Sequence, residues 1–119
     1  FIKSIDEMAR HYASVDLGLA LSGWETFGLS ILESMACGNA QIGASTGAAA
    51  EHVKESNAGV TLETRSPEAL ANAIVELYHS DLTQKKKNAR LYAEKFSWND
   101  CFKRQLELYK NISNQKRKS

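Results

Sequence analysis

The feature that most constrains this chain is a near-continuous apolar run, "VDLGLAL", from Val15 to Leu21. A strand that is covered on both faces has this pattern, and such strands belong to parallel sheets. Two further short runs, at residues 41–45 and 59–62, alternate with helix-like segments. Strand and helix in alternation form the βαβ pattern. We therefore predict an α/β fold of about three parallel strands with flanking helices and right-handed crossovers.

Helices are predicted from capping residues and apolar periodicity. Ser4 and Ser66 are expected N-caps, and Pro67 suits the first turn of the helix after Ser66. The expected helices are residues 4–12, 26–37, 48–55, a segment from 66, 82–96 and 97–115. The helix that starts at 66 is expected to face the core with Leu70, Ala73, Ile74, Leu77 and Tyr78. The helix at 97–115 is expected to have an inner face of Trp98, Phe102, Leu106 and Tyr109. Residues 114–119, "NQKRKS", are expected to be a disordered, solvated end.

Composition narrows the class of protein. The 119 residues suffice for one domain with a modest core, and 24% charged with 43% hydrophobic residues is a soluble globular composition. A net charge of +1 argues against a nucleic-acid partner. Two cysteines make no disulfide framework and favour a reducing, cytoplasmic setting. A peripheral attraction of the basic tail to anionic membranes is the weaker alternative.

The stretch "SGWETFGLSILESMACG", from residue 22 to residue 38, holds the candidate binding groups. In open parallel sheets, ligands bind beyond the carboxyl ends of the strands, where this loop leaves the first strand. Phe27, Gly28 and Leu29 supply backbone N–H groups at the positive end of the next helix. Gly28 also lets a ligand approach the backbone closely. These groups suit a phosphate.

Two glutamates flank this turn. The helix after it is apolar around much of its circumference, which predicts that Glu33 is enclosed and needs a partner, either sugar or ribose hydroxyls or a cationic side chain. Glu33 facing water remains the alternative, as does a merely stabilising role for Glu25 at a helix N-terminus. Gly47, between a strand and a helix, is a second candidate for a ligand-facing turn.

Other candidate groups give weaker signals. His11, His52 and His79 share no ligand spacing, so no metal site is expected. Ser34 and Ser45 have no base placed beside them that would make either a nucleophile. The run of lysines at 85–87 indicates a solvated helix face, with a phosphate contact as the alternative.

The same stretch resembles the donor-site signature of the family-4 retaining glycosyltransferases, which have the GT-B architecture. In that family two glutamates separated by seven residues follow a strand, Phe-Gly follows the first, and Glu-(Ala/Ser)-Met-Ala-x-Gly closes the helix. The segments "YASVDLGLALS", "AAAEHV", "AGVTLETRSPEALANAIVEL" and "NARLYAEKFSW" are also similar to family segments, so the resemblance spans nearly the whole chain. The sequence departs from the family pattern at Leu21, Ala40-Gln41 and Gly47-Ala48, where the family has Pro, Pro-Val and Gly-Gly.

The resemblance implies a role for each matching residue. Glu25 would be the catalytic-site residue that holds hydroxyls of the donor sugar. The N–H groups of Phe27, Gly28 and Leu29 would bind its distal phosphate and sugar, and Glu33 would bind the ribose. The implied reaction transfers a sugar from a UDP- or GDP-sugar to an acceptor with retained anomeric configuration. It requires no cofactor and no metal, because fixed dipoles and cations stabilise the leaving diphosphate.

A GT-B enzyme has two Rossmann-like domains, and the resemblance covers only half of the second. Residues 1–119 are therefore expected to form a single partial nucleotide-sugar-binding domain, without the N-terminal acceptor domain and inactive alone. The strand at 15–21 would lack a neighbour, so we expect self-association through its edge. Two alternatives are a catalytically silent binding or assembly module, and a truncated piece of a hexosyl-type glycosyltransferase. The absence of a starting Met also suggests a piece of a longer protein.

Overall fold

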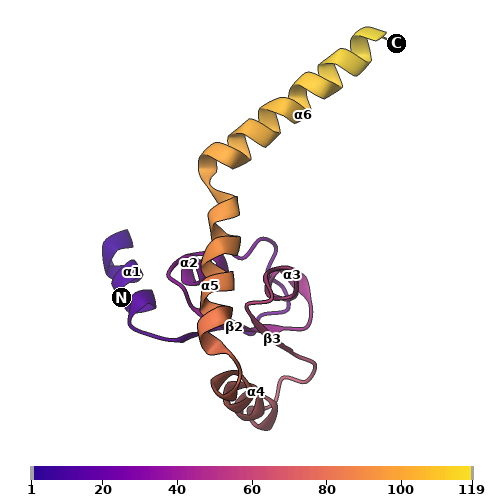
Figure 1. Ribbon diagram of the computed structural model, residues 1–119. Helices are drawn as coiled ribbons and strands as arrows, with labels where there is room; N and C mark the ends of the chain where they lie inside the picture. The colour runs from indigo at the N-terminus through magenta and orange to yellow at the C-terminus, as the bar shows by residue number, and fades with distance from the viewer. Residues whose placement is uncertain (1, 119) are drawn as a thin grey trace.

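The computed structural model describes residues 2–118 and contains a three-stranded parallel sheet with helices on both faces (Figure 1). The strands are β1 (Leu17–Ala20), β2 (Ala40–Ala44) and β3 (Gly59–Leu62), in the order β1-β2-β3. Leu17 is paired with Ala40, and Gln41 with Gly59. The predicted α/β class, strand number and parallel pairing are confirmed.

The described residues also form six α-helices and one 3-10 turn. Ser4 and Ser66 cap their helices as predicted, each accepting a hydrogen bond of 3.1 Å from the backbone N–H three residues later. The elements are α1 (Ile5–Ala13), α2 (Leu29–Ala36), α3 (Gly47–Ser56), α4 (Pro67–His79), α5 (Leu82–Ala93), η1 (Glu94–Phe96) and α6 (Trp98–Lys118).

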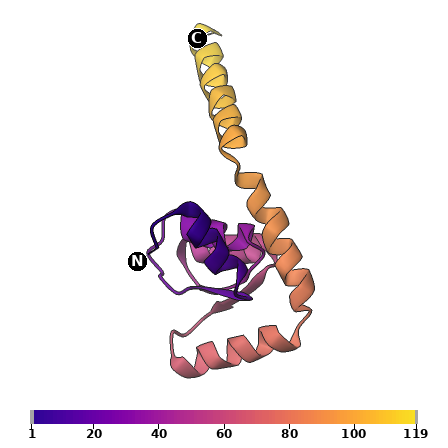
Figure 2. The same cartoon turned by 90° about the vertical axis from the view of Figure 1, so that its left-hand side faces the viewer.

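The core consists of two clusters, one on each face of the sheet. Helix α4 covers one face and lies below the sheet in Figure 2. Helices α2, α3 and α5 pack together on the other face. The first cluster holds Ile42, Leu62, Ala73 and Leu77, and the second holds Ile31, Leu32, Met35, Ala49, Ala58, Ala89, Tyr92 and Ala93. Alternate residues of β2 face opposite clusters, because side chains alternate across a strand.

A buried polar cluster explains the unusual Gln41 in the central strand. Its Nε2 donates to Ser34 Oγ and to the carbonyl of Asn39, both at 3.0 Å. Asn39 Nδ2 donates in turn to the carbonyl of Tyr12 at 2.8 Å. Because a buried amide needs hydrogen-bond partners, Ser34 on α2 makes glutamine tolerable at this position.

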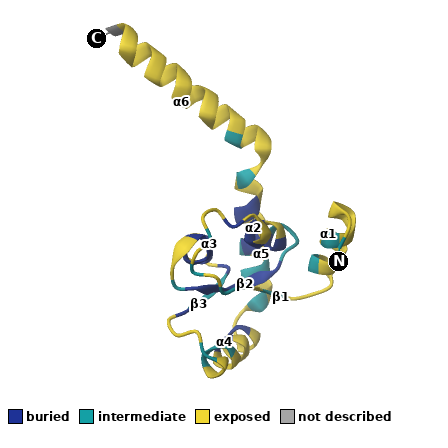
Figure 3. Cartoon of the chain, turned by 180° about the vertical axis from the view of Figure 1, so that it is seen from behind, coloured by how far each residue is buried: buried dark blue, intermediate teal, exposed yellow. Residues whose placement is uncertain are grey.

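Four expectations need correction. Helix α2 begins at Leu29, not at residue 26. On α4, Ile74 and Tyr78 are exposed, so the buried face is narrower than predicted. The residues expected on the inner face of α6 are also exposed, with Trp98 at 72%, because α6 projects from the body of the molecule (Figures 2 and 3). Helix α6 runs to Lys118, where the sequence predicted a disordered end from residue 114; Ser119 lies outside the described residues.

Candidate functional site

The loop between β1 and α2 carries the first candidate groups. Gly28 is the N-cap of α2 and has a left-handed backbone, with φ +79°. Its N–H donates to Glu25 Oε1 at 3.1 Å. A residue with a side chain would be strained in this conformation, so glycine is required to turn the chain into the helix. Glu25 is therefore directed at the start of α2, as a negative charge at a helix N-terminus.

The next three amides of α2 remain available. Among the described residues, no hydrogen bond involves the N–H of Leu29, Ser30 or Ile31, and Leu32 makes the first helical bond, to the carbonyl of Gly28 at 3.0 Å. Helices α1, α4 and α5 differ, because Ser4, Ser66 and Asp81 cap them. Uncapped amides and the helix dipole together favour an anion at this end of α2.

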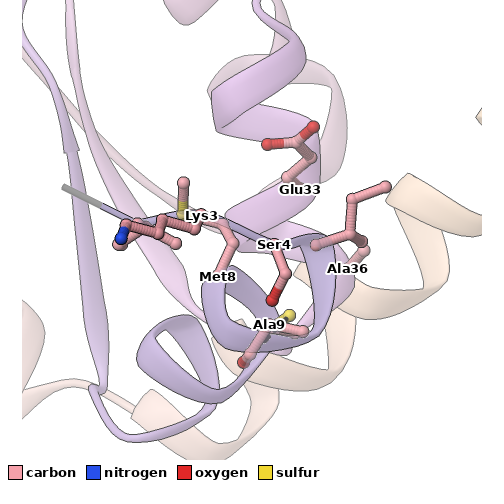
Figure 4. Close-up of a pocket in the computed structure, with 9 residues that line it drawn as sticks. Lys3, Ser4, Met8, Ala9, Glu33 and Ala36 are labelled. Carbon is pink, nitrogen blue, oxygen red and sulfur yellow. Dashed lines mark hydrogen bonds between the residues drawn. The ribbon is translucent and has the colours of Figure 1, made fainter.

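Glu33 lies on the exposed side of α2, which corrects the expectation of an enclosed carboxylate. It borders a cavity of about 460 Å³ between α1 and α2, and Figure 4 draws it among the lining residues together with Lys3. It also borders a second cavity of about 260 Å³ together with Phe27 and Leu29. The structure thus brings Glu33 beside part of the predicted turn, while Glu25 points to the Gly28 amide.

Gly47 lies against the same loop. It has φ +71°, and an added Cβ would lie 3.0 Å from the carbonyl oxygen of Gly23 and 3.1 Å from that of Glu25. The N–H of Ala48 donates to the Glu25 carbonyl at 3.0 Å. The first turn of α3 is therefore fixed to the Glu25 loop, at the carboxyl ends of β1 and β2.

His52 lies near the turn and is a residue for which the sequence indicates no role. It is 6% exposed, on α3, and its Nε2 lies 2.6 Å from the carbonyl oxygen of Phe27. Its Nδ1 lies 3.0 Å from the Tyr92 hydroxyl, which donates to Glu55 Oε2 at 2.8 Å. Burial, followed by the bond to Glu55, raises the pKa of the Tyr92 phenol above its usual value. The local sequence "AAAEHV" gives no sign of these contacts, because the partners are distant in the chain.

Two other features are absent from the part of the chain that the structure describes. Within residues 2–118, no group of three or more His, Cys, Asp or Glu side chains is arranged to hold a metal ion. No helix in the same part of the chain has both the length and the apolar character needed to cross a membrane.

The fold and this turn define a class of protein. Residues 1–80 match the family model "Glycosyl transferases group 1". The chain is 36% identical over 98 residues to the GDP-mannose-dependent alpha-(1-6)-phosphatidylinositol dimannoside mannosyltransferase of Mycobacterium tuberculosis, covering 82% of this chain and 25% of that protein. It is 35% identical over 95 residues to the D-inositol 3-phosphate glycosyltransferase of Geodermatophilus obscurus, covering 79% and 21%.

Two solved structures indicate the same class of protein. The chain superimposes on a sucrose-phosphate synthase from Thermosynechococcus elongatus with a TM-score of 0.79 and 27% identity, over 97% of this chain and 30% of that one. It also matches a glycosyltransferase from Rickettsia africae with a TM-score of 0.69 and 30% identity, over 86% and 28%. The chain belongs to the group 1 glycosyltransferases of GT-B fold. It spans about a quarter of the length of the curated relatives named above.

Proposed function

We propose that this chain is the donor-binding part of a retaining glycosyltransferase that takes its sugar from a UDP- or GDP-sugar. The observation that carries the proposal is the row of uncapped amides at Leu29, Ser30 and Ile31, next to the left-handed Gly28. A diphosphate matches these donors in charge and geometry. Family membership supports the same assignment. No cofactor or metal is proposed.

Two carboxylates complete the proposed site. Glu33 borders the cavity that also holds Phe27 and Leu29, so a nucleotide whose phosphate lies at the amides brings its ribose within reach of this residue. Glu25 would hold hydroxyls of the transferred sugar. Because Glu25 accepts a hydrogen bond from the Gly28 N–H without ligand, it has to leave this amide when the phosphate arrives.

Titration of the ¹⁵N-labelled chain with UDP, GDP and ADP tests donor binding. Amide signals of residues 27–31 should shift, whereas those of Ala69 and Gln84, at helix starts already capped by side chains, should not. GDP-mannose is a reasonable first sugar donor, because one relative is a GDP-mannose-dependent mannosyltransferase. No shift at millimolar nucleotide would instead favour the silent binding module.

The role of Glu33 can be separated from mere helix charge. A nucleotide that lacks the ribose hydroxyls should bind the native chain more weakly than GDP does. In Glu33→Gln, the two nucleotides should bind with equal affinity. Glu76→Gln, a matched change at an exposed helical glutamate, should keep the preference. Equal preference in Glu33→Gln and the native chain would contradict the ribose assignment.

Transfer of a sugar needs an acceptor as well as a donor. The chain matches only 25% of the mannosyltransferase and 30% of the sucrose-phosphate synthase. We propose that an N-terminal acceptor domain supplies the rest of the active site and that these residues alone are inactive. Both cysteines are free, which supports a cytoplasmic setting as part of the proposal.

We further propose that the isolated chain self-associates through β1. This strand is an edge of the sheet in the described residues, and Leu19 on it is 55% exposed. An unpaired edge with apolar side chains attracts a second strand. Light scattering should give a mass above the monomer at high concentration, and Leu19→Lys should restore the monomer. A monomeric native chain at high concentration would argue against the proposal.

A further inference from the structure

The turn that carries the uncapped amides is anchored from inside the protein by one histidine. His52 contacts three separate segments: the carbonyl of Phe27 before α2, the hydroxyl of Tyr92 on α5 and the ring of Phe96 in η1. The His52 and Phe96 rings meet edge to face, with centroids 5.6 Å apart. This packing leaves the imidazole little freedom to leave the Phe27 carbonyl.

The protons of this chain of contacts can be assigned. A carbonyl oxygen only accepts, so the 2.6 Å contact to Phe27 requires a proton on Nε2 of His52. When the Tyr92 hydroxyl donates to Glu55, its oxygen accepts from Nδ1, and the imidazole carries both protons. When the imidazole is neutral, the hydroxyl turns to donate to Nδ1 instead. Nε2 keeps its proton in both states, so the bond to Phe27 persists.

This bond fixes the peptide that matters for the ligand. The carbonyl of Phe27 and the N–H of Gly28 belong to one planar trans peptide and point in opposite directions. Holding the carbonyl against buried His52 therefore directs the Gly28 N–H away from the core, where Glu25 meets it at 3.1 Å. His52 also lies close to Gly28, since a Cβ added there would lie 3.4 Å from His52 Cδ2.

We infer that His52 is a positioning residue for the donor turn: its Nε2–H holds the Phe27–Gly28 peptide so that the amides at the start of α2 face the ligand. The inference rests on the proposed function for its consequence in binding, but not for the contact itself. Tyr92 and Glu55 act on the turn through His52, by fixing the orientation of its ring. A nucleoside diphosphate is the ligand class that would benefit.

Two substitutions separate positioning from packing. His52→Gln places an amide N–H close to where Nε2 lies, whereas His52→Asn reaches only as far as Nδ1, and both lose the aromatic ring. In the ligand-free chain, hydrogen exchange at the Gly28 amide should accelerate about tenfold in His52→Asn, because one net hydrogen bond is lost. It should stay within about twofold of the native rate in His52→Gln, although both variants lose the aromatic ring and should unfold at a lower temperature than the native chain.

Binding follows the same order if the donor site is correctly assigned. GDP, UDP and ADP serve as probes, and their dissociation constants should rise about tenfold in His52→Asn and recover in His52→Gln. If the native chain binds none of them, the proposed function fails, while exchange at Gly28 still decides the role of His52. Equal exchange rates in the two variants would overturn the inference.

A measurement on the native chain needs no variant. The ¹⁵N signals of the His52 ring should report a protonated Nε2, since the Phe27 carbonyl that it contacts can only accept a hydrogen bond. An Nε2 without its proton in the folded native chain would contradict the contact and, with it, the inference.

Discussion

The Glu25 carboxylate accepts a hydrogen bond from the Gly28 N–H, which the donor phosphate is proposed to use. Glu25→Ala should therefore tighten binding of a nucleoside diphosphate about fivefold, since one competing hydrogen bond is removed. The same variant should bind the sugar nucleotide no better than the diphosphate, because the sugar has lost its partner. Calorimetric titration with GDP and GDP-mannose measures both effects.

Net charge alone could also strengthen the binding of an anion. Glu63→Ala makes the same change in charge at an exposed position in the sequence after β3 and serves as the matched control. Glu63→Ala should bind the nucleoside diphosphate no more tightly than the native chain does, and it should keep the preference for the sugar nucleotide. A gain of similar size in Glu63→Ala would reduce the Glu25 effect to long-range electrostatics.

Tyr92 makes the free energy of unfolding depend on pH in the alkaline range. Burial and Glu55 raise the pKa of its phenol in the folded chain, so the folded state holds this proton more tightly than the unfolded state. This contribution to the free energy of unfolding is complete below about pH 10, the usual pKa of tyrosine, and decreases as the pH rises further. Urea unfolding at about pH 8 and about pH 11 should show the loss, and Tyr92→Phe should make it smaller. An unchanged loss in Tyr92→Phe would assign it elsewhere.

The residues of the site differ in how well the sequence predicts them. The turn at 27–29 follows from strand, glycine and helix in succession, a local pattern. His52 could not be found in this way, because Phe27 and Tyr92 lie 25 and 40 positions from it. The apolar helix around Glu33 predicts an enclosed carboxylate, yet the Glu33 side chain is exposed.

At the level of the elements, β2 and β3 come close enough to exclude a side chain at Gly59. A Cβ there would overlap the backbone of Gln41, its partner in the register. Gly59→Ala should lower the free energy of unfolding by about 3 kcal/mol, because the strands must separate. Gly38→Ala is the comparison: φ is +83° but the space around an added Cβ is empty, so about 1 kcal/mol of backbone strain is expected.

Urea unfolding of the two variants distinguishes crowding from strain. Equal losses would mean that the strands accommodate a methyl group at no more cost than the backbone strain at residue 38. Such a result would contradict the close register between Gln41 and Gly59.

The elements were largely predictable because their signals are local. Each observed strand lies within two residues of the apolar run that predicted it, and Ser4 and Ser66 mark helix starts by their own hydrogen bonds. The sequence predicts too early a start for α2, because Gly28 takes a left-handed conformation that apolar periodicity does not reveal.

For the whole molecule, α6 adds length but little burial. Every residue from 102 to 117 is exposed, so a chain ending at Ser97 loses almost no buried apolar surface. Its free energy of unfolding should lie within about 1 kcal/mol of that of the full chain. A chain ending at Ser80, which also lacks the core residues Ala89 and Tyr92 of α5, should lose cooperative unfolding. Unfolding of the chain ending at Ser97 at much lower urea would contradict the view of α6 as an appendage.

The exposed face of α6 is where sequence and structure differ most. The spacing of Trp98, Phe102, Leu106 and Tyr109 predicted an apolar face correctly, but a periodic pattern cannot tell what covers that face. Within the described residues, the body of the domain does not cover it (Figure 3).

The projection of α6 also governs how the molecule rotates in water. The principal axes of the molecule measure 57 × 33 × 29 Å. The radius of gyration of the molecule is 17.0 Å, against about 13.5 Å for a compact chain of this length. Such a body spins about its long axis faster than it turns end over end. The N–H bonds of α6 run nearly parallel to that axis, so they reorient only by the slower, end-over-end motion. Their nuclear magnetic resonance lines should therefore be broader than those of the sheet.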